Sequence, residues 1–292
     1  MDPALAPGQI VAGKYRVDAP LGAGGMGVVV RATHLELGHQ VALKCLRPEV
    51  APLPYLLARF QREARTLARL RSEHVARVFD VGTLPSGLPF IVMELLEGVD
   101  LGRRLRALRR LPAAEAVEAV LQACDALAEA HALGIVHRDL KPSNLFRAER
   151  SGARAAIKVL DFGISRLLEA EPGAMRLTSP EAALGSPRYI APEQACDPRD
   201  ADPRSDVWSL GIILFELCAG AAPFDDLRTE RMLARVLTEP APDLGRRGVP
   251  VPPGLPAVVA RCLAKDPADR FADAAALAAA LAPCAPAPGA AP

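Results

Sequence analysis

The runs HRDLKPSN (residues 137–144) and VLDFG (residues 159–163) carry the strongest signal in this sequence for its fold and its chemistry. They place two carboxylates, Asp139 and Asp161, near the amine of Lys141 and the amide of Asn144. Phosphoryl transfer depends on positioning and charge neutralisation more than on covalent chemistry. One carboxylate can orient a hydroxyl, while the amide and the other carboxylate are oxygen ligands that suit Mg²⁺. His-Arg-Asp alone indicates only a surface turn; the longer string predicts a site for a metal-bound phosphate.

Length and composition indicate a globular protein with two lobes. The chain has 292 residues, of which 50% are apolar and 24% are charged, and its net charge is +1. This balance gives no sign of bulk nucleic-acid binding or of a membrane-surface protein. The longest apolar helix candidate, residues 207–222, is too short to span a bilayer and contains Ser209 and Glu216.

The cysteines and the N-terminus favour a reducing cytoplasm. None of the six cysteines belongs to a C-x-x-C pair, so buried reduced thiols are favoured over a zinc site. Residues 1–11 lack the basic and apolar regions of a signal peptide. Residues 1–12 are expected to form a flexible leader and the Ala/Pro-rich residues 282–292 a disordered tail. Membrane tethering would require a native chain that continues past residue 292.

A glycine-rich run, LGAGGMGVVV, occupies residues 21–30. Gly22, Gly24 and Gly27 fit the spacing G-x-G-x-x-G, and glycine lets backbone N–H groups approach phosphate oxygens closely. A dinucleotide-binding turn shares this spacing, but there the glycines open a helix. Here β-branched residues 28–30 follow, which favours a strand–turn–strand lid over a nucleotide. A flexible turn without a ligand is the alternative.

Lys44 ends a predicted strand, residues 41–44, where a solvated charge would be ordinary. The following segment has an apolar stripe at helical spacing, and Glu63 falls on that stripe. The stripe consists of Leu56, Leu57, Phe60, Ala64, Leu67 and Leu70. A carboxylate that faces a core needs a partner. Lys44 is the obvious candidate, and such a pair would hold the lysine against phosphates.

The middle of the chain changes from strands to helices. Strands are predicted at residues 75–81 and 88–94, and residues 93–98 form a hinge whose backbone could meet an adenine edge. Asp100 then begins a helix; it caps that helix, touches a ribose or meets a basic substrate residue, and the cap is favoured. A strong helix follows at residues 113–133, from Pro112 to Gly134.

The second half combines a mobile loop with helices. A short hairpin is predicted around residues 149–156. Residues 164–185 have few periodic apolar residues and are expected to form a mobile loop. An apolar helix that must sit in a core opens at residue 206, and helices separated by Pro-rich loops continue to about residue 281.

Taken in order, these motifs resemble the Hanks-type serine/threonine protein kinases, and most closely their bacterial, eukaryotic-like branch. The resemblance covers residues 10–281. Besides the runs already quoted, it rests on Val41-Ala42-Leu43-Lys44, Glu63, Ala191-Pro192-Glu193, Asp206 and Arg270. It implies an α+β, two-lobed protein-kinase fold: an antiparallel β-sheet N-lobe with one key helix (residues 13–94), a hinge (94–98) and a mainly α-helical C-lobe (99–281). ATP would lie in the cleft between the lobes.

The resemblance also implies roles for individual residues. The catalytic group is Asp139, Lys141, Lys44 and Glu63, with Asp139 orienting the substrate hydroxyl. Asn144 and Asp161 would hold Mg²⁺, with Mn²⁺ as a substitute. The implied cofactor-binding residues are Leu21, Gly22, Gly24, Gly27, Val29, Ala42, Lys44, Met93, Glu94, Leu96, Asp100 and Phe146. The implied structural residues are a stack of Leu67, Val78, His137 and Phe162, an ion pair of Glu193 with Arg270, and Asp206 bracing the catalytic loop.

Regulation is implied by Arg138, which precedes the catalytic aspartate. A loop phosphate could pair with Arg138 and order the loop. Thr178 and Ser179 are the candidates, although the loop departs from the usual paired-threonine pattern. Ser186 stands where this group more often has threonine, and it keeps the hydroxyl that would contact Asp139 and Lys141.

The expected activity is transfer of the γ-phosphate of MgATP to serine or threonine hydroxyls of proteins, including autophosphorylation, in signal transduction. The partners are protein substrates, ATP and a second copy in a homodimer for autophosphorylation, without nucleic acid. A pseudokinase scaffold would lack a catalytic residue, and none is missing. A small-molecule phosphotransferase would generally lack the Ala-Pro-Glu closure with Asp206 and Arg270. A non-enzymatic nucleotide sensor is the weakest alternative.

Overall fold

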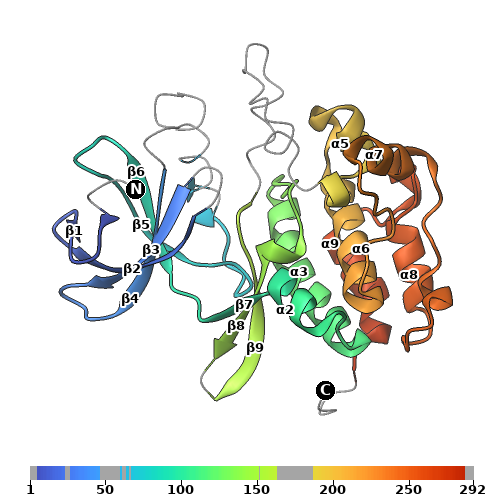
Figure 1. Ribbon diagram of the computed structural model, residues 1–292, viewed down its shortest axis with the longest axis horizontal. Coiled ribbons are helices and arrows are strands. Elements are labelled where there is room, and N and C mark those ends of the chain that lie inside the picture. Colours follow the sequence, from blue (N-terminus) through green and yellow to red (C-terminus); the bar gives the residue numbers. More distant parts are fainter. Residues whose placement is uncertain are drawn as a thin grey trace. The chain divides into compact units, whose positions relative to one another are not determined.

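A computed structural model describes residues 5–23, 27–46, 60, 64–65, 67–150, 152–162 and 187–286. The chain forms two compact units (Figure 1). Unit 1 consists of residues 1–71 and 76–97, and unit 2 consists of residues 72–75 and 98–292.

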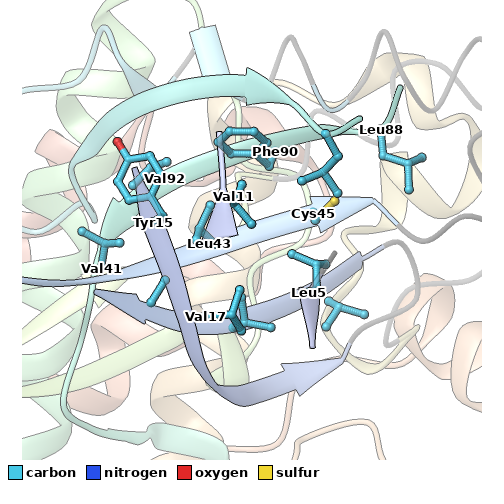
Figure 2. Close-up of a cluster of buried hydrophobic side chains, with 14 residues drawn as sticks. Leu5, Val11, Tyr15, Val17, Val41, Leu43, Cys45, Leu88, Phe90 and Val92 are labelled. Carbon is cyan, nitrogen blue, oxygen red and sulfur yellow. The ribbon is translucent and has the colours of Figure 1, made fainter. Parts of the chain in front are cut away.

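Unit 1 contains a six-stranded antiparallel sheet in the order β1-β2-β3-β4-β6-β5. Its strands are β1 (Ile10–Val11), β2 (Tyr15–Ala23), β3 (Gly27–His34), β4 (Gln40–Leu46), β5 (Val78–Thr83) and β6 (Pro89–Glu94). Strand residues alternate between two faces. Val41, Leu43 and Cys45 therefore join the apolar cluster drawn in Figure 2. The intervening residues Ala42 and Lys44 lie on the opposite face of β4.

The expected apolar stripe is present where the structure describes it. Phe60 and Ala64 pack with Leu46 and Ile91 in a second cluster of unit 1, and Leu67 is buried. Leu56, Leu57 and Glu63 lie outside the described residues. The predicted strand end at Lys44 is wrong, because β4 continues two residues beyond it. The burial of Lys44 agrees with the expectation that it is not an ordinary solvated charge.

The N-terminal segment needs a correction. The expected flexible leader includes Leu5, which is only 2% exposed, and Val11, which pairs with Tyr15 in the sheet. Residues 5–12 are thus part of the packed unit, because Leu5 and Val11 bury their side chains in the cluster of Figure 2. Residues 1–4 lie outside the described part.

Unit 2 is mainly helical. Its helices are α2 (Leu101–Leu108), α3 (Ala113–Ala132), α5 (Pro192–Cys196), α6 (Pro203–Ala219), α7 (Thr229–Thr238), α8 (Leu255–Cys262) and α9 (Ala274–Leu281). The 3₁₀ turns are η3 (Pro142–Asn144), η4 (Pro187–Tyr189), η5 (Pro198–Asp200), η6 (Leu244–Arg247), η7 (Pro267–Asp269) and η8 (Ala282–Cys284). A three-stranded sheet consists of β7 (Gly98–Asp100), β8 (Leu145–Arg150) and β9 (Ala153–Val159). The β8–β9 pair confirms the predicted hairpin.

The helix signals explain where α3 and α6 begin and end. Pro112 precedes α3, and Gly134 adopts a φ of 71° just after it, as predicted. Helix α6 begins earlier than expected because Asp202 caps it, accepting a hydrogen bond from Arg204 N at 2.8 Å. Its residues are buried almost all round, which agrees with the predicted core helix.

A short piece of chain from the middle of unit 1's sequence belongs to unit 2. Residues 72–75 contact α3 and β9 there: Ser72 N donates to Glu129 Oε2 at 2.7 Å, and Val159 N donates to His74 O at 2.8 Å. Val75 also forms a parallel bridge with Val159. The predicted strand at residues 75–81 consequently begins only at Val78.

Two further expectations concern the cysteines and the C-terminal residues. None of the six cysteines forms a disulfide; five are buried as expected, whereas Cys196 is exposed at the end of α5. The expected disordered tail needs a correction for residues 282–284, which form η8 with Cys284 buried. Residues 287–292 are outside the described part. No helix in the described part of the chain is long and apolar enough to cross a membrane.

Candidate active site

The catalytic loop of unit 2, residues 137–144, is held in place by Asp206. The buried Asp206 carboxylate, in the first turn of α6, accepts hydrogen bonds from His137 N (2.8 Å, Oδ2) and Arg138 N (2.9 Å, Oδ1). Arg138 has a φ of 68°, an uncommon conformation for a residue with a side chain. The two hydrogen bonds therefore fix a strained turn, which is the brace that the resemblance implies for Asp206.

His131 is a supporting residue that the sequence reasoning missed. Its Nε2 lies 2.9 Å from Asp206 Oδ2, and its Nδ1 accepts a hydrogen bond from Ala274 N at 3.3 Å. Because Nδ1 is an acceptor, Nε2 carries the proton and donates it to Asp206. The only sequence signal was a histidine in the last turn of α3, and its partner lies 75 positions away.

Three side chains expected to do chemistry lie together on this loop. Lys141 Nζ is 2.7 Å from Asp139 Oδ2, and Asn144 Nδ2 donates to the backbone oxygen of Asp139 at 2.8 Å. Asp139 and Lys141 are half-buried, so both reach the surface, whereas Asn144 is buried. A carboxylate and an amine in this contact can orient a hydroxyl and meet a phosphate oxygen.

Asp161 is brought to the same loop by the backbone. Leu160 N donates to Asn144 O at 2.8 Å, and Asp161 follows with a φ of 51°. Phe162 is buried, with its ring centroid 4.9 Å from that of His137. His137 Nε2 lies 3.0 Å from Leu160 O. His137 is fully buried, so it packs and orients this turn, which agrees with the packing role that the resemblance implies.

The donor set fits a hard divalent cation. The amide nitrogen of Asn144 is engaged with Asp139 O, which leaves the amide oxygen as its ligand atom. An amide oxygen and the Asp161 carboxylate are the ligand types that Mg²⁺ prefers, with phosphate oxygens and water completing its coordination. Among the described residues, no group of three or more His, Cys, Asp and Glu side chains forms a protein-only metal site.

Unit 1 carries the residues predicted to meet the nucleotide. Across the sheet, Val29 pairs with Lys44 and Ala42 pairs with Met93, so these four side chains lie on one face. This is the face opposite the cluster of Figure 2. The other predicted residues of unit 1 lie at strand ends: Leu21 and Gly22 are near the end of β2, Gly27 begins β3, Glu94 ends β6, and Leu96 follows before unit 2 begins. Gly24 is not among the described residues.

Asp100 and Phe146 lie in unit 2, on one rung of the β7–β8 pair. Asp100 caps α2, accepting a hydrogen bond from Arg103 N at 2.8 Å. The favoured interpretation of Asp100 as a helix cap is therefore confirmed. The cap uses Oδ1, and Arg103 Nε lies 3.3 Å from Oδ2.

Arg138 points a buried guanidinium into unit 2. The residue is 9% exposed, and Nη2 donates to Ala201 O at 3.3 Å. Nε and Nη1 are buried without a hydrogen-bond partner in the described part of the chain. Burial lowers the pKa of Arg138, and the nearby Asp206 carboxylate opposes this shift. Gly163, Thr178, Ser179 and Ser186 fall outside the described residues.

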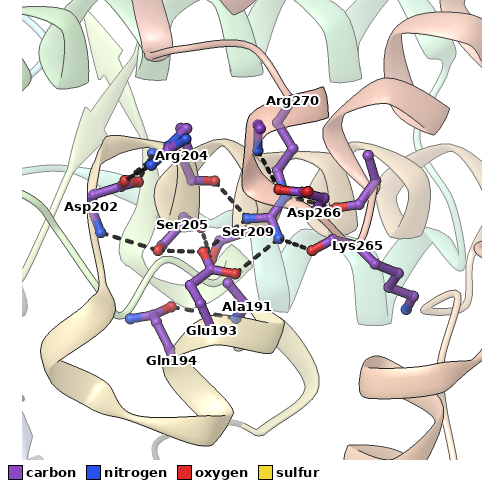
Figure 3. Close-up of polar contacts among 12 residues, drawn as sticks. Ala191, Glu193, Gln194, Asp202, Arg204, Ser205, Ser209, Lys265, Asp266 and Arg270 are labelled. Atoms are coloured by element: carbon purple, nitrogen blue, oxygen red, sulfur yellow. Dashed lines mark hydrogen bonds and ion pairs between the residues drawn. The ribbon is translucent and has the colours of Figure 1, made fainter.

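A buried ion pair joins Glu193 of α5 to Arg270, which follows η7 (Figure 3). Arg270 Nη1 and Nη2 each donate to one carboxylate oxygen of Glu193 at 2.9 Å, and Ser205 Oγ donates to the same carboxylate at 2.6 Å. Arg270 also donates to the backbone oxygens of Ala264 and Lys265. This is the Glu193–Arg270 pair that the resemblance implies, and it ties α5 to the η7 turn.

A second polar network was missed by the sequence reasoning. Tyr189 Oη donates to Glu216 Oε2 at 2.7 Å, and Arg188 bridges Glu216 and Asp225 at 3.4 and 2.7 Å. Burial raises the pKa of Glu216, although the Tyr189 hydroxyl and Arg188 oppose this shift. Glu216 on an apolar helix was a usable signal, because a carboxylate in a core needs a partner.

The sheet of unit 1, the helices of unit 2 and the loop at residues 137–144 define the class of proteins with the protein-kinase fold. The chain matches the protein kinase domain family over residues 15–281. Since this match covers most of the chain, the protein belongs to the protein kinase family, on its bacterial serine/threonine branch.

Two curated relatives and one solved structure illustrate the similarity. The serine/threonine-protein kinase Pkn1 of Myxococcus xanthus is 39% identical over 90% of this chain and 37% of its own length. PknB of Mycolicibacterium smegmatis is 39% identical over 91% of this chain and 42% of its own length. The chain therefore spans less than half of these relatives. The kinase domain of Mycobacterium tuberculosis PknI superposes with a TM-score of 0.71 at 31% identity, covering 97% of this chain and 100% of that one.

Proposed function

We propose that this protein transfers the γ-phosphate of MgATP to serine and threonine hydroxyls of proteins in bacterial signalling. The observation that carries the proposal is the contact of Asp139 with Lys141 and Asn144 on a loop braced by Asp206. In this reaction Asp139 accepts a hydrogen bond from the substrate hydroxyl and orients its oxygen. Lys141 neutralises charge on the transferred phosphoryl group.

The remaining predicted residues hold the nucleotide and its metal. Asn144 and Asp161 would hold Mg²⁺, which offsets the negative charge of the phosphates; Mn²⁺ suits the same oxygen ligands. Lys44 would hold the α- and β-phosphates and pair with Glu63. Gly22, Gly24 and Gly27 would let backbone N–H groups approach the phosphate oxygens of the nucleotide. Lys-Pro-Ser at residues 141–143 supports serine and threonine over tyrosine as acceptors, because tyrosine kinases usually place Ala and Arg there.

The location and the assembly belong to the same proposal. ATP and reduced cysteines are features of the cytoplasm, and none of the six cysteines forms a disulfide. Autophosphorylation would occur between two copies of the chain. Exposed apolar side chains on unit 1 support such an association: Leu37 lies on the β3–β4 turn, and Phe79 and Val81 lie on the edge strand β5.

The test replaces Asp139 by asparagine and follows labelled phosphate from ATP into the chain itself and into lysate proteins. We expect transfer to fall by at least about a thousandfold, equal to about 4 kcal/mol of transition-state stabilisation, while nucleotide affinity stays within a few-fold. A matched control is Asp200→Asn, an exposed carboxylate at the end of η5. Near-normal transfer by purified Asp139→Asn would refute the assigned role.

A further inference from the structure

A cavity of about 520 Å³ opens on unit 2, and none of its lining residues belongs to the catalytic loop. It lies where α2, the connector from α2 to α3, the C-terminal end of α6 and residues 249–250 meet, and Figure 1 shows these helices as neighbours in that unit. We call it the α2–α6 groove. Its size lies in the range of pockets that hold a small ligand or a few side chains of a bound peptide, rather than a whole domain.

The backbone fixes the shape of this groove. Leu111 N, on the connector, donates to Leu217 O at the end of α6 with a length of 2.8 Å. Gly220 follows α6 with a φ of 80°, and a Cβ at this position would stand 2.6 Å from Arg109 O. The connector and the helix end are therefore in direct backbone contact, so the groove is preformed.

One part of the groove is apolar. Leu111 and Cys218 are buried at its base, and Leu108 is 48% exposed on its wall. Val249 and Pro250 also line it. An exposed leucine beside buried apolar groups favours a partner's apolar side chain, because the contact removes apolar surface from water.

The polar part of the groove is positively charged. Glu115, the acidic residue in its lining, makes a two-point ion pair with Arg104 at 2.6 and 3.0 Å, and the hydrogen bond to Glu115 raises the pKa of Arg104. Arg110 also lines the groove and has no carboxylate partner among the described residues. Arg247 lies nearby, with its guanidinium 5.2 Å over the ring of Phe215, one turn before Cys218.

The sequence around the groove adds to its positive charge. Residues 101–112 contain five arginines and no carboxylate, although the whole chain has a net charge of only +1. Two of these arginines are ion-paired, with Asp100 and with Glu115, and the other three have no carboxylate partner among the described residues. The five are Arg103, Arg104, Arg106, Arg109 and Arg110. A basic edge beside an apolar wall is complementary to a ligand that combines carboxylates with an apolar group.

We propose that the α2–α6 groove docks an acidic segment of a partner protein. One apolar side chain of that segment would rest on Leu108 and Leu111, and an adjacent Asp or Glu carboxylate would meet Arg110. A peptide fits better than a long acyl chain, because an acyl chain laid along the groove would desolvate the Arg104–Glu115 pair without replacing its water. Binding of the segment to the α2–α6 groove requires no phosphoryl transfer, so this proposal can be tested independently of the proposed function.

The test selects phage-displayed random ten-residue peptides on the immobilised chain and measures the enriched peptides by fluorescence anisotropy. We expect Asp or Glu residues flanking one Leu, Ile or Phe, and weaker binding at higher salt. Arg110→Glu and Leu108→Ser should each weaken binding about tenfold or more. Arg231→Glu and Leu227→Ser make the same changes at exposed positions elsewhere in unit 2 and should leave affinity unchanged.

Unfolding temperatures of all four variants establish that each one is folded. The proposal is overturned if no acidic peptide is enriched, or if folded Arg110→Glu and Leu108→Ser bind as the unmodified chain does. Vesicles of phosphatidylglycerol serve as the second probe. Arg110-dependent binding to these vesicles without peptide binding would assign the groove to a lipid surface instead and also overturn the proposal.

Discussion

At the scale of single residues, Asp206 is the side chain that holds the backbone of the catalytic loop in place. Its two carboxylate oxygens accept three hydrogen bonds, from His137 N, Arg138 N and His131 Nε2. An asparagine in its place would keep the shape but turn an NH₂ group toward at least one of these donors. Hydrogen bonds to a charged acceptor contribute about 1.5–3 kcal/mol each. We therefore expect Asp206→Asn to lower the free energy of unfolding by about 2–3 kcal/mol and turnover at least tenfold.

Urea denaturation and steady-state phosphate transfer measure these two effects. Asp202→Asn is the matched control, because Asp202 caps the same helix and asparagine caps about equally well. Its ion pair with Arg204 is half-exposed, so its loss should change stability little. A fully active, fully stable Asp206→Asn protein would show that the catalytic loop does not need this brace.

The buried guanidinium of Arg138 is a candidate binding site for a regulatory phosphate. Two of its guanidinium nitrogens are buried without a partner in the described chain, which is costly for a charged group. We propose that a phosphate on Thr178 or Ser179 supplies the missing acceptor. Thr178→Ala should then lower turnover about tenfold, as expected for losing a charge-assisted hydrogen bond. In an Arg138→Ala background the same change should have no further effect.

This double-mutant cycle has its own control in Ser179→Ala, which distinguishes the two candidate hydroxyls. Phosphopeptide mass spectrometry locates the modified residue. Unchanged turnover in Thr178→Ala, together with spectra that contain no phosphate in the loop, would contradict the proposal. A loss of equal size in both backgrounds would show that Arg138 is not the partner.

At the scale of elements, β3 offers a way to separate a structural glycine from a ligand-binding one. A Cβ on Gly27 would stand 2.6 Å from Cys45 O on β4, whereas a Cβ on Gly22 would meet nothing within 4 Å. Gly27→Ala should therefore lower the unfolding temperature, since β3 and β4 must separate. Gly22→Ala should leave stability unchanged and raise the KM for ATP, because only the bound phosphates would be crowded.

Calorimetry and ATP-dependent kinetics on this pair of variants provide the measurement, with each variant serving as the other's control. If Gly22→Ala is destabilised as much as Gly27→Ala, the space around Gly22 on β2 is not as open as described. If Gly22→Ala leaves KM unchanged, Gly22 is a turn residue that does not approach the nucleotide.

The elements also show what the sequence could predict. Helices α3 and α6 were predictable because long apolar patterns are local signals, as are Pro112 and Gly134 at the ends of α3. The Asp202 cap was missed, so the start of α6 was placed too late, at residue 206. Strand β7 was not, because three residues are too few for an alternating pattern. The packing of Leu5 was also hidden, since its partners on the sheet are distant in sequence. The Tyr189–Glu216 and His131–Asp206 contacts were missed for the same reason.

At the scale of the whole molecule, the candidate site residues are divided between two units. Lys44, Val29 and Ala42 belong to unit 1, whereas Asp139, Asn144 and Asp161 belong to unit 2. The spacing of residues within each motif predicted the site residues of unit 1 and those of unit 2 separately. That both sets of residues act on one nucleotide follows only from the resemblance and the proposed function. A pattern along the chain predicts only the local contacts within each set.

The proposed function therefore predicts that MgATP stabilises both units together. A ligand that binds only the folded protein adds about 2.7 kcal/mol of stability at a hundred times its Kd. With Mg²⁺ and a non-hydrolysable ATP analogue, we expect one thermal transition at higher temperature. Lys44→Met and Asp161→Asn should each abolish most of this shift, although they lie in different units. A matched control, Lys14→Met, changes an exposed lysine of unit 1 and should preserve the shift. A shift that survives both Lys44→Met and Asp161→Asn would mean that the analogue binds elsewhere.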